Sequence, residues 1–133
     1  MNIPTYVITM IGEGMSENLA QECINSANIF GIQPEIFPAT WGDDVEKHFV
    51  EQDLKVFKKG QKRKEINPGL KGCLLSHYRL WKKCIASAEP MIIFEHDAIV
   101  LREIPENLLD KFEDVLHLAV SYTHLTLPTM RTV

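Results

Sequence analysis

The sequence lacks a long apolar run and an excess of basic residues. No apolar stretch reaches the roughly 20 residues that a membrane-spanning helix needs, and the N-terminus has no signal-peptide pattern. The formal net charge of -4 argues against a nucleic-acid-binding surface spread over the whole protein. We expect a cytoplasmic protein without a nucleic-acid partner, and we leave open a peripheral attachment to the inner face of the membrane.

Cysteine is scarce: Cys23, Cys73 and Cys84 are an odd number with no Cys-x-x-Cys pair. This pattern suggests neither a disulfide framework nor a zinc knuckle. Cys73 and Cys84 share a predicted helix, whose rise separates them by about 16 Å, beyond the reach of a disulfide. We expect reduced, partly buried thiols.

The chain has 133 residues, of which 45% are hydrophobic and 24% are charged. This composition is typical of one globular domain with a single core. A chain of this length has few residues left over for a second domain, so we expect any architecture of two lobes to be incomplete.

The first part of the chain predicts a β-α-β unit. Residues 5–9 form a β-branched and aromatic run, residues 16–30 have the apolar spacing of an amphipathic helix, and Gly31 follows as its C-terminal cap. Residues 33–38 then read as a second strand. Such a unit makes a parallel pair of strands in an α/β sheet.

The remainder predicts further helices and strands. We expect a polar helix at 43–57, an exposed basic loop at 58–64, a helix of about twenty residues from Gly69, a strand at 91–94, a short helix at 107–112 and a strand at 114–118. The long helix carries an apolar stripe formed by Leu70, Leu74, His77, Trp81, Cys84, Ile85 and Ala88. We therefore expect Trp81 to be largely buried.

Glu95, His96 and Asp97 directly follow the apolar strand 91–94. In extended backbone, residues i and i+2 face the same way, so Glu95 and Asp97 can present two carboxylates to one point. Carboxylate oxygens suit Mn²⁺ or Mg²⁺, and the carboxyl end of a strand is where open α/β sheets bind ligands. The competing interpretation is a polar strand exit at the surface.

Ser76 and His77 are adjacent on the long helix, so they point about 100° apart and do not suit a nucleophile and its base. We expect the His77 ring to pack on the sheet side and the Ser76 hydroxyl to bond the carbonyl one turn back or a nearby loop. The second interpretation gives both residues a role in a donor pocket.

One longer string makes the pattern more specific. It runs Gly69-Leu70-Lys71-Gly72-Cys73-Leu74-Leu75-Ser76-His77-Tyr78-Arg79-Leu80-Trp81, and Glu95-His96-Asp97-Ala98 follows it. This combination resembles glycosyltransferase family 25, whose signature has Gly-Cys, Ser-His and often Trp before an apolar strand and Glu-Asp-Asp. The resemblance extends over roughly residues 3–118.

The resemblance implies an α/β fold, a Rossmann-like sandwich of the GT-A type with a mainly parallel sheet, truncated in this chain. It implies a metal-dependent, inverting transfer of a hexose such as galactose from a nucleotide-diphosphate sugar to a surface glycan such as lipooligosaccharide. Ser76, His77, Glu95 and Asp97 would then bind the donor, and Glu95 and Asp97 would also hold Mn²⁺ or Mg²⁺. No catalytic base can be named, and the oligomeric state stays open.

Two departures from the family pattern support an alternative. His96 stands at the central acidic position, and residues 11–14 replace an arginine-rich turn. The alternative is a non-catalytic or vestigial module that binds nucleotide sugars.

The end of the chain differs from the rest. Residues 120–129 resemble the translation of a transposase adapter used in sequencing libraries. We therefore assign residues 1–119 to the N-terminal part of the family domain and residues 120–133 to a non-native tail. We expect the resulting fragment to be inactive as an enzyme.

Overall fold

The computed structural model describes residues 2–54 and 68–118. Residues 2–101 form one compact unit, and a second unit begins at Arg102. The predicted basic loop at 58–64 and the tail at 120–133 lie outside the described residues. Among the described helices, none combines the length and apolarity needed to cross a membrane.

Three strands of the first unit form a parallel sheet. They are β1 (Thr5–Thr9), β2 (Glu35–Pro38) and β3 (Ile92–Glu95), in the order β2-β1-β3. On the central strand, Val7 pairs with Ile36 on one side and with Phe94 on the other. All five residues of β1 are buried, as expected for a strand covered on both faces. The strands predicted at 5–9, 33–38 and 91–94 are confirmed, and so is the parallel sheet.

Local hydrogen bonds fix both ends of α1 (Gly14–Ile29). The Glu13 carboxylate accepts the Ser16 N–H at 2.7 Å at the first turn. At the C-terminal end, Gly31 adopts a φ of +77°, and the N–H groups of Gly31 and Ile32 donate to the carbonyls of Asn28 and Ala27. This is a Schellman motif, so the predicted glycine cap is confirmed.

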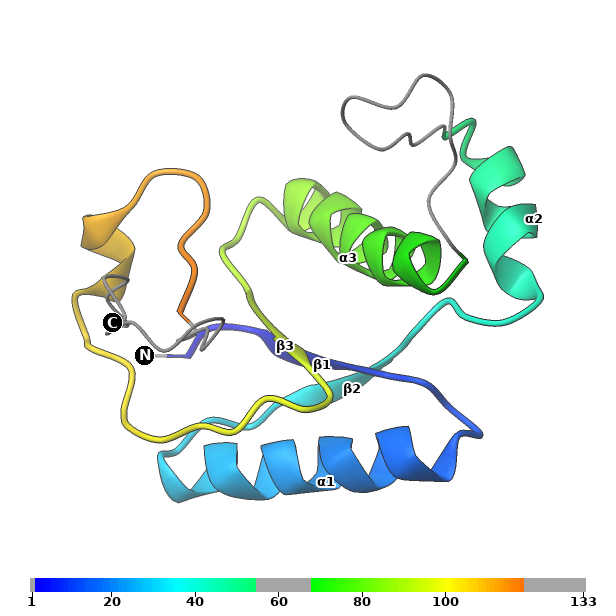
Figure 1. The fold of residues 1–133 in the computed structure, drawn as a ribbon. Helices are drawn as coiled ribbons and strands as arrows, with labels where there is room; N and C mark the ends of the chain where they lie inside the picture. Colours follow the sequence, from blue (N-terminus) through cyan, green and yellow to red (C-terminus); the bar gives the residue numbers. More distant parts are fainter. Residues whose placement is uncertain (1, 55–67, 119–133) are drawn as a thin grey trace, which may run out of the picture. The chain divides into compact units, whose positions relative to one another are not determined.

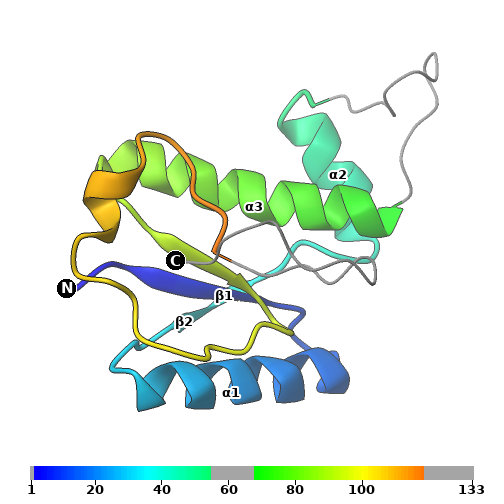
Figure 2. The same cartoon turned by 60° about the vertical axis from the view of Figure 1, so that its left-hand side comes forward.

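The sheet lies between two helices. Figures 1 and 2 show α1 across one face and α3 (Pro68–Ser87) across the other. On β1, Val7 packs with Cys23 of α1, whereas Tyr6 and Ile8 pack with Leu80 of α3. The connection from β1 through α1 leads to β2 on one side of β1, and the connection from β2 through α3 leads to β3 on the other side. The chain therefore has a topological switch point between β1 and β3.

The short helix α2 (Asp44–Glu51) packs against α3. Val45 and Phe49 form a buried cluster with Leu75. The Lys71 ammonium, on the buried side of α3, lies 2.9 Å from a Glu46 carboxylate oxygen. This contact fixes the N-terminal half of α3.

The prediction of a buried Trp81 is wrong. Leu75 and Leu80 are fully buried, whereas the Trp81 side chain is 47% exposed and Ile85 is 79% exposed. The apolar stripe read from the sequence lies beside the true packing face. The reason is tertiary, because the contacts of α3 with the end of β2, described below, set the rotation of the helix.

The predicted strand at 114–118 is also absent. The second unit contains the 3-10 helix η1 (Leu108–Lys111), which agrees with the predicted short helix, but residues 112–118 have no strand. A strand needs a hydrogen-bonded neighbour, and neither ladder of the described sheet includes this segment. Val115 is accordingly 88% exposed.

Leu80→Ala should lower the free energy of unfolding by about 2–5 kcal/mol, because it empties a fully buried position against Tyr6 and Ile8. Trp81→Ala, at the half-exposed neighbouring position, should cost clearly less. Urea denaturation of the two variants measures the difference. Equal losses would contradict the observed rotation of α3.

Candidate functional site

The polar residues of the site follow the carboxyl ends of β1 and β3. The chain leaves β1 at Thr9 and turns at Gly12 into α1, while β3 ends at Glu95 and is followed by His96 and Asp97 in a turn. These two strand ends border the topological switch point, where open α/β sheets form their ligand crevice. The acidic motif therefore lies where the fold favours binding.

The first residue of each motif, Gly72 of Gly-Cys and Ser76 of Ser-His, packs against Thr40. A Cβ at position 72 would lie 2.7 Å from the Thr40 carbonyl oxygen, so Gly72 lets α3 approach the end of β2. The Ser76 hydroxyl accepts the Thr40 N–H at 3.0 Å and donates to the Gly72 carbonyl at 2.7 Å. The expected bond from Ser76 to the carbonyl one turn back is confirmed.

Arg79 completes this contact one turn later. Its guanidinium donates to the Pro38 carbonyl at 3.1 Å and to the Thr40 hydroxyl at 3.0 Å, and it lies over the Phe37 ring. Three residues of one helix face thus hold the end of β2: Gly72, Ser76 and Arg79.

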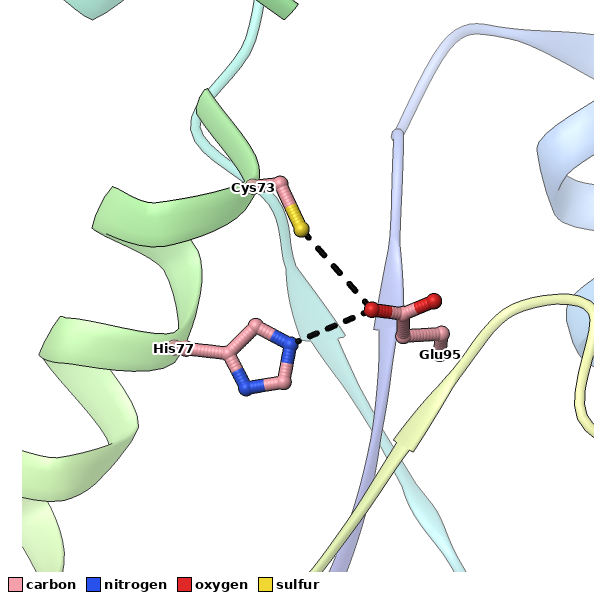
Figure 3. A group of neighbouring side chains, drawn as sticks. All are labelled: Cys73, His77 and Glu95. Carbon is pink, nitrogen blue, oxygen red and sulfur yellow. Dashed lines mark hydrogen bonds and ion pairs between the residues drawn. The ribbon is translucent and has the colours of Figure 1, made fainter. Parts of the chain in front are cut away.

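The next face of α3 carries Cys73 and His77, and both point toward Glu95 (Figure 3). The Cys73 thiol lies 3.8 Å from Glu95 Oε1, and His77 Nε2 lies 3.5 Å from the same oxygen. One ligand atom from each residue lies within 4.8 Å of the other two. Cys73, His77 and Glu95 therefore form one cluster.

Glu95 also changes the chemistry of Cys73. Partial shielding from water, the negative charge of Glu95 and the thiol's bond to that carboxylate all raise the pKa of Cys73 above its usual value. Without a bound cation, the thiol keeps its proton and donates a hydrogen bond to the Glu95 carboxylate.

His96 faces α1 rather than Glu95. Its Nδ1 lies 2.6 Å from the buried Ser16 hydroxyl, which also accepts the Met10 N–H at 2.9 Å. In the tautomer with hydrogen on Nε2, Ser16 donates to Nδ1. The imidazole at the usual acidic position of the motif thus ties the turn after β3 to the start of α1.

Asp97 lies outside the extended part of the chain. Because β3 ends at Glu95, the alternation of side chains in a strand does not extend to Asp97. Burial, together with the Asp97 charge, raises the pKa of the Cys23 thiol on α1 to about 11. The proximity of the Glu95 and Asp97 carboxylates to one another stays a prediction.

Residues 3–129 match the description "Glycosyltransferase family 25 (LPS biosynthesis protein)". The chain belongs to glycosyltransferase family 25. The expected family is thereby confirmed, and the described α/β unit with its parallel sheet is compatible with a Rossmann-like glycosyltransferase. No curated protein matches the chain. The assignment of residues 120–133 to an adapter-derived tail stays a prediction.

Two site residues of this family 25 chain were missed at the sequence level, Cys73 and Ser16. The Cys-x-x-x-His spacing of Cys73 and His77 on one helix face was a usable signal, because residues four apart are neighbours on a helix. Ser16 gave no local signal, since its contact with His96 joins residues eighty positions apart.

Gly72→Ala should lower the free energy of unfolding by about 1–3 kcal/mol, because the new methyl group would overlap the Thr40 carbonyl. Gly14→Ala is the matched control, because a Cβ at position 14 would meet open space and the residue begins α1. This substitution should leave the free energy of unfolding unchanged or raise it. Urea denaturation compares the two. A Gly72→Ala protein as stable as wild type would exclude the close contact.

Cys23 should make the fold less stable in alkaline solution. The thiol ionises near pH 9.0 when unfolded and near pH 11 when folded, so stability falls across this window. The expected loss is on the order of 1–3 kcal/mol. Urea titrations at neutral and alkaline pH measure it, and Cys23→Ala should remove it. Asp97→Asn should reduce it, because the neighbouring charge is gone.

Proposed function

We propose that this chain takes part in transfer of a hexose from a nucleotide-diphosphate sugar to a hydroxyl of a surface glycan such as lipooligosaccharide. The observation that carries the proposal is the family 25 match over residues 3–129. We take UDP-galactose as the donor to test first.

The arrangement of the site supports donor binding at the switch point. Glu95 is the last residue of β3 and Asp97 follows it, and the turn at His96 is tied to the start of α1 through Ser16. His77 approaches Glu95 from α3, so it can orient that carboxylate. Ser76 is buried between two backbone partners, and its contribution to the donor pocket is to hold α3 in place.

Glu95 and Asp97 are the residues we assign to Mn²⁺ or Mg²⁺. Both are exposed carboxylates at the end of the sheet, and their oxygens suit these hard cations. His96 Nδ1 is already paired with Ser16, so we do not assign His96 to the ion. When bound, such an ion neutralises charge that develops on a leaving diphosphate.

A second candidate is a module that binds nucleotide sugars without turnover. The observation that favours it is the His96 to Ser16 contact, which gives the central position of the motif a structural partner. In a full-length relative that carries these residues, binding of donor without transfer to a lipooligosaccharide acceptor would support this candidate over the first.

The test is calorimetric titration of the chain with UDP-galactose and other nucleotide-diphosphate hexoses, with and without Mn²⁺. We expect saturable binding that strengthens with the cation. Asp97→Asn should weaken binding in Mn²⁺ by roughly tenfold or more. The matched control is Glu35→Gln, which removes a carboxylate at the opposite, amino end of the sheet. Absence of saturable binding by any donor would overturn both candidates.

A further inference from the structure

Three side chains of different chemistry converge beside the end of β3. Cys73 and His77 stand one turn apart on α3, and Glu95 faces both from the strand (Figure 3). The cluster contains one thiol, one imidazole and one carboxylate. These are the three ligand types that proteins use for zinc.

The distances agree with a common tetrahedral centre. With zinc bonds of about 2.0–2.3 Å, neighbouring ligand atoms of a tetrahedron lie about 3.3–3.8 Å apart. The corresponding separations are 3.8 Å from Cys73 to Glu95 and 3.5 Å from His77 to Glu95. The third separation, between the Cys73 and His77 ligand atoms, is at most 4.8 Å, so side-chain movements on the order of 1 Å bring all three atoms to one ion.

We propose that Cys73, His77 and Glu95 bind a divalent transition-metal ion of the zinc type, with one coordination position left open. Binding forms one bond each from sulfur, nitrogen and oxygen to the ion, and the thiol proton passes to water. The site goes beyond glycosyl transfer, because Cys73 and His77 are not needed to hold Mn²⁺ or Mg²⁺ and its ion needs no sugar donor. It shares Glu95 with the pair of carboxylates assigned to Mn²⁺ or Mg²⁺.

The ligand set selects against Mg²⁺ and Mn²⁺. A thiolate is a soft ligand that favours zinc-like ions, whereas Mg²⁺ and Mn²⁺ prefer carboxylate, carbonyl and water oxygens. The Glu95 carboxylate is a ligand that both kinds of ion accept, whereas the Cys73 thiolate favours the zinc-type ion. A zinc-type ion at this position would therefore engage Glu95 from the side of α3.

The cluster is open to solvent, so an ion can enter it. Cys73 is exposed, and the side chains of His77 and Glu95 are 25% and 59% exposed. Three protein ligands with an accessible fourth position are the arrangement of a zinc site that also takes water or an exogenous ligand.

The test is titration of the chelator-treated, tag-free chain with Co²⁺, whose thiolate charge-transfer band reports a sulfur ligand. We expect saturation at one ion per chain, and displacement by Zn²⁺ but not by Mg²⁺. Cys73→Ser should abolish the charge-transfer band. His77→Gln and Glu95→Gln should each weaken Co²⁺ binding by roughly tenfold or more.

Cys84→Ser is the matched control, because this thiol lies on the same helix but bonds the Glu89 carbonyl. It should leave the cobalt spectrum unchanged. A band that is missing in the wild type, or that survives in Cys73→Ser, would overturn the proposal. If Cys73→Ser fails to fold, X-ray absorption of the zinc-loaded wild type decides, because absence of a sulfur ligand at about 2.3 Å also overturns it. The Co²⁺ titration needs no sugar donor. A negative result in it is therefore distinguishable from a negative result in the donor-binding experiment.

Discussion

The close approach of α3 to the end of β2 is the contact on which the rest of the site depends. It requires a residue without a side chain at position 72, since the Thr40 carbonyl occupies the space of a Cβ. The Ser76 hydroxyl and the Arg79 guanidinium then satisfy backbone groups of residues 38 and 40. These polar contacts fix both the depth and the rotation of the helix.

That rotation explains how one motif serves packing and chemistry together. Consecutive residues on a helix are about 100° apart, so Cys73 and His77 lie on the face next to Gly72 and Ser76. When the first pair packs against Thr40, the second pair is turned toward Glu95. The sequence Gly-Cys-x-x-Ser-His is therefore two interleaved pairs, each with a spacing of one helical turn.

Much of the unit could be predicted because its signals are local. The strand at β1, the cap at Gly31 and the polar exit at Glu95 each depend on a few neighbouring residues. The rotation of α3 could not be predicted, because Leu75 and Trp81 are both apolar and only the contact with Thr40 decides between their faces. The prediction of a strand at 114–118 was wrong for a related reason, because a strand-like sequence does not by itself provide the neighbouring strand with which it must pair.

The sequence named Glu95, Asp97, Ser76 and His77 as candidate site residues, but it predicted neither their arrangement nor the participation of Cys73 and Ser16. Glu95 faces α3, because the alternation of β3 continues to that residue, whereas Asp97 lies beyond the strand and acts on Cys23 of α1. The turn that His96 fastens to Ser16 lies between these two carboxylates in the chain, so a ligand that contacts both would lie beside this turn. This chain has an imidazole hydrogen-bonded to Ser16 at the position of the family's usual aspartate, so Glu95 and Asp97 are the two carboxylate residues left in the motif.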